Sequence, residues 1–384
     1  MKKLIKAAFI VCLLLLSAGF AYAADEVGIS IDGTQVEFTQ ESGQPFIDEN
    51  NRTQVPFRQT LEAFGATVNW DPDSRTAIAE KDGVIVNVPI GADYIYKGDL
   101  QVMNDTKSLI KDGRTYLPIR IVLEAFGADV SFDAQSRTVL VKSDGETLSL
   151  SILAAEVNAA MEAVKSMDAE MTMDIKMEIA GEKIDMTSAM KMSMFYDPLK
   201  IKIINETSAA GVSAKVETYL TQKGDNLTAY VSIDGADYVK ALEMNADEYD
   251  DMIKNESLAN MLPKFENKGM ETVGGVSTVK LEGVISKEMM EEVFSSLDFS
   301  SLLSGTEGAE NFELAAADIP MTIWIDTQSK IIVKYSIDIA EYLLATLQAM
   351  PGAEDAKVNA ANAEVMISNI NKAAEFTLPE KLPE

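Results

Sequence analysis

The sequence predicts an α+β protein in which two small sheet-and-helix modules precede a larger meandering antiparallel sheet. A segment of 27 residues that starts at Arg52 returns 62 residues later at Arg114, without a gap and with 15 identities. Such a duplication indicates two copies of one supersecondary unit. Beyond residue 150, hydrophobic and polar residues alternate over long stretches, as in strands with one buried face. Other stretches there have hydrophobic residues at helical spacing.

Residues 1–23 have the layout of a secretory signal peptide. Three lysines precede the apolar run AAFIVCLLLL, and the small residues Ala21 and Ala23 then form an A-x-A cleavage site. The apolar core is shorter than the roughly 20 residues that span a bilayer. We therefore expect secretion and no transmembrane segment after cleavage. An uncleaved amino-terminal anchor is the alternative, because residues 7–24 carry no charge.

Composition excludes several classes of function. The chain has no histidine, and its single cysteine, Cys12, lies within the predicted signal peptide. Histidine-based triads, thiol nucleophiles and His or Cys metal sites are therefore excluded, and we expect no cofactor and no metal. The net charge is −28, which repels nucleic acid and anionic membranes. We expect a non-enzymatic protein that does not bind nucleic acid.

Each repeat has the pattern of a short helix followed by strands. Pro56 stands where the helix of the first copy begins, since proline presets φ there. Gly65 follows the helix, as expected for a left-handed C-cap. The apolar face of this helix consists of Phe57, Leu61 and Phe64. The equivalent residues of the second copy are Pro118, Gly127, Ile119, Leu123 and Phe126.

Strands are expected on both sides of each helix. Val68 and Trp70 alternate as a strand that faces the first helix, and Val130 and Phe132 do so in the second copy. Asp32-Gly33 and Lys111-Asp112-Gly113-Arg114 are typical hairpin turns. The charged residues of the helices, Arg58 with Glu62 and Arg120 with Glu124, are four apart and favour structural ion pairs over a site.

The pattern RTxxPxRxxLEAFGAxVxxD resembles the copper amine oxidase amino-terminal-like domain, also called the stalk domain. The resemblance covers residues 28–142 in two copies, and we place the modules at residues 24–82 and 83–148. It implies a sheet wrapped around a helix, used as a non-catalytic envelope module in secreted proteins of Gram-positive bacteria. The copper chemistry of the name does not transfer, because this chain lacks histidine.

Composition changes after residue 150, beyond which 18 of the 20 methionines lie. Leu153, Val157, Met161 and Val164 predict an amphipathic helix. Two long strands follow, joined by a turn at Gly181, and their alternation places methionines on one shared face. The candidate hydrophobic ligand face comprises Met171, Met173, Ile175, Met177, Met186, Met190, Met192 and Met194.

Further strands are predicted at hairpin spacing. They cover residues 216–220, 227–233, 276–285, 321–325 and 331–339, with helices at 247–262 and 287–297. The apolar face of such a sheet must be covered by these helices or by a ligand. Methionine is flexible and suits varied apolar partners. Two interpretations stay open: methionines that fill a core, and an apolar groove or cavity for acyl chains.

Residues 152–378 resemble the DUF6612 family and the wider group of lipoprotein carriers with a LolA- or LppX-like half-barrel. The stretches AMEAVKSMDAEMTMDIKMEI and MTIWIDTQSKIIVKYSIDI carry this likeness. It implies, for residues 150–384, an antiparallel β half-barrel covered by helices. The chain has no lipobox cysteine, in contrast to many relatives.

Acidic residues are abundant, but no pair stands out as catalytic. Asp247, Glu248, Asp250 and Asp251 cluster on one predicted helix, which is typical of a solvated face. The function we expect is that of a secreted, non-enzymatic cell-envelope protein, whose stalk modules present a domain that binds a hydrophobic ligand (a lipid or acyl chain) or a partner. The alternative is a structural or adhesive protein associated with the cell wall or another surface protein, without a small-molecule ligand.

Overall fold

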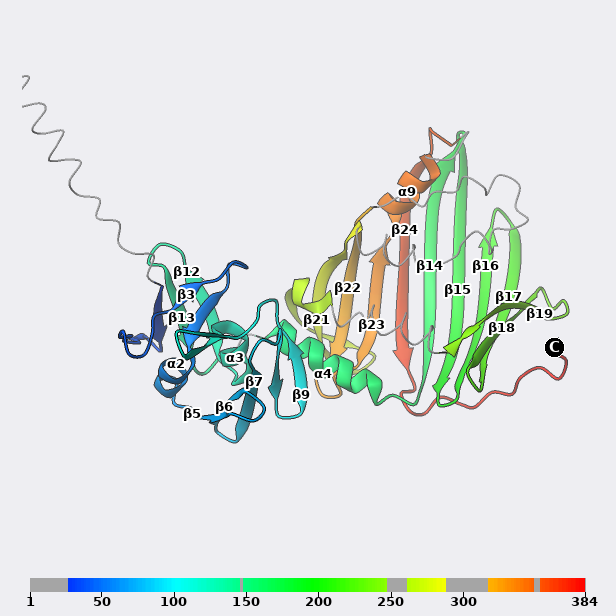
Figure 1. The fold of residues 1–384 in the computed structure, drawn as a ribbon. Coiled ribbons are helices and arrows are strands. Elements are labelled where there is room, and N and C mark those ends of the chain that lie inside the picture. Colours follow the sequence, from blue (N-terminus) through cyan, green and yellow to red (C-terminus); the bar gives the residue numbers. More distant parts are fainter. Residues whose placement is uncertain (1–26, 146–147, 247–260, 288–316, 349–352, 384) are drawn as a thin grey trace, which may run out of the picture. The chain divides into compact units, whose positions relative to one another are not determined.

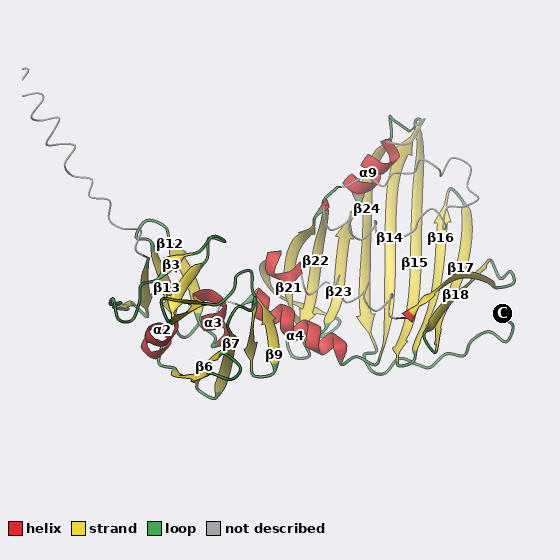
Figure 2. Cartoon of the chain, in the orientation of Figure 1, coloured by secondary structure: helices red, strands yellow, loops and turns green. Residues whose placement is uncertain are grey.

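The computed structural model describes residues 27–145, 148–246, 261–287, 317–348 and 353–383 (Figures 1 and 2). The chain divides into two compact units, unit 1 (Met1–Ser149) and unit 2 (Leu150–Glu384). Small sheets with helices make up unit 1, and one large antiparallel sheet dominates unit 2. The predicted α+β class is therefore confirmed. The predicted signal peptide lies outside the described residues.

Unit 1 contains three sheets in its described part, with strand orders β12-β13-β1-β2, β10-β11-β4-β3 and β5-β6-β7-β8-β9. Its elements are β1 (Gly28–Ile31), β2 (Thr34–Gln35), β3 (Phe46–Ile47), β4 (Thr53–Pro56), α2 (Phe57–Ala63), β5 (Thr67–Asp71), β6 (Thr76–Lys81), β7 (Val84–Pro89), β8 (Tyr94–Lys97), β9 (Leu100–Met103), β10 (Leu109–Lys111), β11 (Arg114–Pro118), α3 (Ile119–Ala125), β12 (Asp129–Asp133) and β13 (Thr138–Lys142).

Strands from both expected modules, residues 24–82 and 83–148, occur in all three of these sheets. β4 of the first copy pairs antiparallel with β11 of the second. β1 pairs in parallel with β13, a parallel contact that the expected antiparallel modules did not include. The rings of Phe64 and Phe126, which are equivalent positions of the two repeats, lie 5.9 Å apart. Each copy therefore completes a sheet of the other within one compact unit.

The helix ends follow the predicted chemistry. Pro56 lies directly before α2 with φ −58°, and Gly65 follows the helix with φ +88°. The N–H of Gly65 donates to the carbonyl of Glu62, and that of Ala66 to Leu61, which is the Schellman pattern. The second repeat has the same bonds, with Gly127 at φ +89°.

The strands after these helices are only partly covered. Val68 is buried, but Trp70 is 39% exposed and Phe132 is 41% exposed, so these two rings are covered only in part. β5 contacts α2, and β12 contacts α3. A helix of seven residues is only about 10 Å long and cannot cover the whole strand. The expected ion pair of Arg58 with Glu62 forms at 3.2 Å.

Unit 2 has an 11-stranded antiparallel sheet in its described part (Figure 1). Its elements are α4 (Leu150–Glu162), β14 (Ser166–Ile179), β15 (Glu182–Tyr196), β16 (Leu199–Ala209), β17 (Val212–Lys223), β18 (Asn226–Ile233), β19 (Val239–Asn245), η1 (Leu262–Lys264), β20 (Glu266–Val273), β21 (Val276–Ile285), β22 (Ile319–Asp326), β23 (Ile332–Asp338), α9 (Ala340–Gln348) and β24 (Lys357–Ser368).

The strand order is β19-β18-β17-β16-β15-β14-β24-β23-β22-β21-β20, so the described strands form an open half-barrel with β19 and β20 at its edges. The last strand, β24, lies in the middle between β14 and β23 (Figure 1). α9 packs along β24, and α4 contacts η1. The helices predicted at residues 247–262 and 287–297 fall almost entirely outside the described residues.

Candidate functional site

The eight predicted ligand-face residues lie on one face of the β14–β15 hairpin. Ala180 and Gly181, both with positive φ, form the tight turn that sets the register. In this register Met171 lies opposite Met190, and Ile175 lies opposite Met186. Directly opposed residues of an antiparallel pair point to the same side of a sheet. We call this side of the large sheet the apolar face.

The apolar face continues across the neighbouring strands in cross-strand rows. The row through Met171 comprises Val365, Met171, Met190, Asn205, Val216 and Ile233. The next row comprises Ile367, Ala169, Met192, Ile203, Thr218 and Val231. A third comprises Met167, Met194, Ile201, Leu220, Ala229 and Leu242. On the other side of Met171, the row comprises Ala363, Met173, Ser188, Thr207 and Ala214. None of these rows contains a charged residue.

The reverse side of the same strands, which we call the polar face, carries charges. Lys191 pairs with Glu170 at 3.8 Å, and Lys357 pairs with Glu178 at 3.2 Å. Because successive residues of a strand point to opposite sides, the sheet separates an uncharged surface from a charged one. Sequence reasoning found this separation on β14 and β15 only. The alternation of Leu199, Ile201 and Ile203 would have extended it to β16.

Burial of the apolar face changes along the strands. Leu227 is 1% exposed and forms a hydrophobic cluster with Leu199 and Ile201. Ile233, six residues later on the same strand and the same face, is 56% exposed. The face is therefore buried at one end of β18 and accessible at the other.

The predicted methionines divide along this gradient. Met192 and Met194 pack against the Leu199 cluster and against a second cluster around Met167, so these two contribute to a hydrophobic core. Ile175 is 4% exposed. The other five candidates are half-buried: Met171, Met173, Met177, Met186 and Met190.

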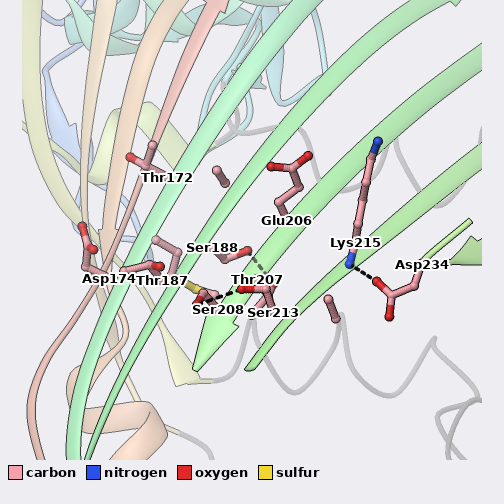
Figure 3. A pocket seen from close by; sticks show the side chains of 13 residues that line it. Thr172, Asp174, Thr187, Ser188, Glu206, Thr207, Ser208, Ser213, Lys215 and Asp234 are labelled. Atoms are coloured by element: carbon pink, nitrogen blue, oxygen red, sulfur yellow. Dashed lines mark hydrogen bonds between the residues drawn. The ribbon is translucent and has the colours of Figure 1, made fainter. Parts of the chain in front are cut away.

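A groove of about 510 Å³ lies over β14 to β17 and is lined mainly by polar side chains (Figure 3). Most of its lining residues belong to the polar face: Thr172, Asp174, Thr187, Ala189, Glu206, Ser208, Ser213 and Lys215. Of the eight predicted ligand-face residues, only Met173 borders it. The groove is therefore a feature of the polar face that sequence reasoning missed, and it is not the expected apolar cavity.

The charged and phenolic side chains beside this groove form an ion pair and a hydrogen bond at the surface. The Nζ of Lys215 lies 2.9 Å from Glu217, which raises the pKa of Lys215. Lys215 and the hydroxyl of Tyr238, which donates to Glu217 at 2.9 Å, lower the pKa of Glu217. Burial, followed by the bond to Glu217, raises the pKa of the Tyr238 phenol. These groups stabilise one another and hold no poised acid or base.

Other features of the described residues bear on function. No group of three or more acidic or cysteine side chains in the described ranges is arranged to hold a metal ion. None of the helices described is both long and apolar enough to cross a membrane. The acidic cluster at residues 247–251 lies outside the described part of the chain.

Two family models agree with the two expected resemblances. The model of the copper amine oxidase N-terminal domain matches residues 30–141 and 100–179. The solved Mycobacterium tuberculosis lipoprotein LppX is similar at 16% identity, over 58% of this chain and 97% of LppX, with a TM-score of 0.31. LprF from Mycobacterium bovis is also 16% identical, over 60% of this chain and 95% of LprF, with a TM-score of 0.32. The model of the DUF6612 family, a family of unknown function, matches residues 149–383, and the chain belongs to this family.

Proposed function

We propose that this protein is a secreted, non-enzymatic component of the cell envelope, in which unit 2 binds a hydrophobic ligand such as a lipid or acyl chain. The observation that carries this proposal is the uncharged apolar face, which continues over seven neighbouring strands, from β24 to β19, in the rows described above. Its half-buried methionines can adapt to ligands of different shape because their side chains are flexible and polarizable.

Several observations support a binding role over catalysis. The chain has no histidine, and its one cysteine lies in the predicted signal peptide. Beside the polar groove, Lys215 pairs with Glu217, Glu217 accepts a hydrogen bond from Tyr238, and Asp234 accepts one from the backbone N–H of Lys215. The match to the copper amine oxidase N-terminal domain supports a stalk role for unit 1.

The experiment is to measure binding of an apolar fluorescent probe, and to identify lipids that copurify with the protein by native mass spectrometry and organic extraction. Met171→Glu places a charge in the centre of the apolar face and is expected to weaken probe binding at least tenfold, because a buried charge is strongly disfavoured. Thr172→Glu, on the polar face of the same strand, is the matched control and should bind like the unaltered protein. If no lipid copurifies with the protein and the probe does not bind, the proposal is refuted.

A structural or adhesive surface protein is the second candidate. It is favoured by Met192 and Met194, which pack within hydrophobic clusters as core residues do. In that case the protein would be retained on purified cell walls of its own host while its organic extract contained no lipid. Retention together with bound lipid would instead fit the first proposal, with unit 1 as the attachment.

A further inference from the structure

Three neutral polar side chains interrupt the apolar face at one place. Ser188 on β15 lies directly opposite Thr207 on β16, and Asn205 lies two residues from Thr207 on the same face. Ser188 is only 4% exposed, and Asn205 and Thr207 are half-buried. Polar groups in an apolar surface are unfavourable unless they are hydrogen-bonded.

The hydrogen bonds within this trio have a defined direction. The Ser188 hydroxyl donates to Oδ1 of Asn205 at 2.7 Å. Its oxygen also lies 3.1 Å from Oγ1 of Thr207. Because a hydroxyl has a single hydrogen, Thr207 must be the donor to Ser188. The bonds therefore run from Thr207 through Ser188 to Asn205 and orient the Asn205 amide.

Because the Oδ1 atom of Asn205 accepts the bond from Ser188, the Nδ2 group of the same amide is the part that can donate to a ligand. Within the described part of the protein, Ser188 is the hydrogen-bonding partner of Asn205, and it occupies the oxygen, not the nitrogen. An amide NH2 can donate two hydrogen bonds. The trio thus presents a donor to the apolar face, and the matching ligand group is an acceptor.

The surroundings restrict that acceptor to a neutral group. Met173, Met190, Ala214 and Val216 adjoin the trio in its cross-strand rows, and no charged residue occurs in these rows. An ionised carboxylate or phosphate would lose its hydration here without gaining a counter-charge. An ester carbonyl loses little hydration and needs only a donor.

The position of the trio also gives an orientation. Towards one end of the strands, the next rows lead through Met192 and Met194 to the buried Leu199 cluster. Towards the other end, the face reaches Val212, which is 72% exposed. An acyl chain would lie towards the cluster, and the rest of the lipid would lie towards the exposed end.

We propose that Asn205, held by Ser188 and Thr207, binds the carbonyl oxygen of a neutral acyl ester whose hydrocarbon chain lies along the methionines of the apolar face. This inference rests on the proposed ligand-binding function and specifies its ligand class. Asn205 is the residue that selects an ester over a purely apolar chain.

The test compares two lipids that differ only at the carbonyl. 1-Monooleoylglycerol contains the ester carbonyl, and 1-O-oleylglycerol has a methylene group in its place. Their affinities are measured on the full mature chain by displacement of an apolar fluorescent probe. The unaltered protein is expected to prefer the ester by about five- to tenfold, the range of one hydrogen bond. Asn205→Leu should remove this preference and retain the affinity for the ether.

Asn362→Leu, the same substitution on the polar face of β24, is the matched control and should keep the preference. Asn205→Asp has nearly the same shape but no N–H group, so it should lose the preference as well, whether or not the leucine variant folds. Equal binding of both lipids to the unaltered protein would refute the role of Asn205 in binding the ester carbonyl, and so would a preference that survives both Asn205 variants. Neither result would contradict the proposal that the apolar face binds a hydrophobic ligand. Failure of either lipid to bind would count against the proposed function itself.

Discussion

The burial gradient along β18 can be tested by two substitutions on the same strand and the same face. Leu227 and Ile233 both belong to the apolar face, but Leu227 is 1% exposed and Ile233 is 56% exposed. Replacing each by alanine removes hydrocarbon from opposite ends of the face. If the face is buried at one end only, the two variants must differ clearly in the free energy of unfolding.

The expected magnitudes follow from these exposed fractions. Leu227→Ala removes a fully buried isobutyl group from the cluster with Leu199 and Ile201, and such truncations cost about 2–5 kcal/mol, including the cavity that remains. Less than half of the Ile233 side chain is withdrawn from water, and no closed cavity can form there. Its truncation should therefore cost about 1 kcal/mol.

Urea unfolding followed by tryptophan fluorescence measures both variants. The chain contains two tryptophans, Trp70 in unit 1 and Trp324 on β22 of unit 2. Trp70→Phe leaves Trp324 as the only reporter, so the transition of unit 2 is observed alone. Equal destabilisation by Leu227→Ala and Ile233→Ala would refute the gradient, and with it the orientation assigned to a bound acyl chain.

Equivalent positions of the two repeats of unit 1 serve as controls for one another in the further predictions. Unfolding of unit 1 is followed by the fluorescence of Trp70 after Trp324 has been replaced. Burial raises the pKa of Glu124, so its proton is held to higher pH in the folded state and stability falls as pH rises above about 4.5. Glu124→Gln should therefore stabilise unit 1 by up to about 1 kcal/mol at pH 7 and by less at pH 4. Glu62→Gln, at the equivalent but exposed position of the first repeat, should not stabilise unit 1. An equal gain in stability for both variants would contradict burial as the cause. Gly65→Ala and Gly127→Ala should each cost about 1 kcal/mol in urea unfolding, because both glycines have φ near +90° and neither added methyl group would clash. A large difference between these two alanine variants would indicate packing strain instead.

Local chemistry explains which parts of the fold could be predicted from the sequence. The glycine caps depend on a backbone conformation that disfavours other residues, so Gly65 and Gly127 mark helix ends without reference to the rest of the chain. The alternation over residues 171–194 likewise follows from the two-residue period of a strand and identified β14 and β15. The residues of these elements are sufficient to predict them, and the structure contains the same elements.

Elements that depend on tertiary contacts could not be predicted. β24 begins with KVNAANAEV, and alanine and asparagine have low strand propensity. It is a strand because β14 and β23 hydrogen-bond to it on both sides, which no local pattern reveals. The polar groove has the same origin: Thr172, Glu206 and Lys215 lie far apart in the sequence, and only the strand register brings them together.

The choice of hydrophobic residues within the sheet supports an adaptable surface on β14 and β15. On β21 and β22 the same face carries Leu281, Ile323 and Ile325, all fully buried, and their branched side chains have few rotamers. A core with one fixed arrangement favours such residues, because flexible side chains lose more conformational entropy when they are ordered. The chain can therefore build a rigid core where it needs one. The five half-buried methionines on β14 and β15 are costly for a rigid core but suit a surface that repacks around different acyl chains.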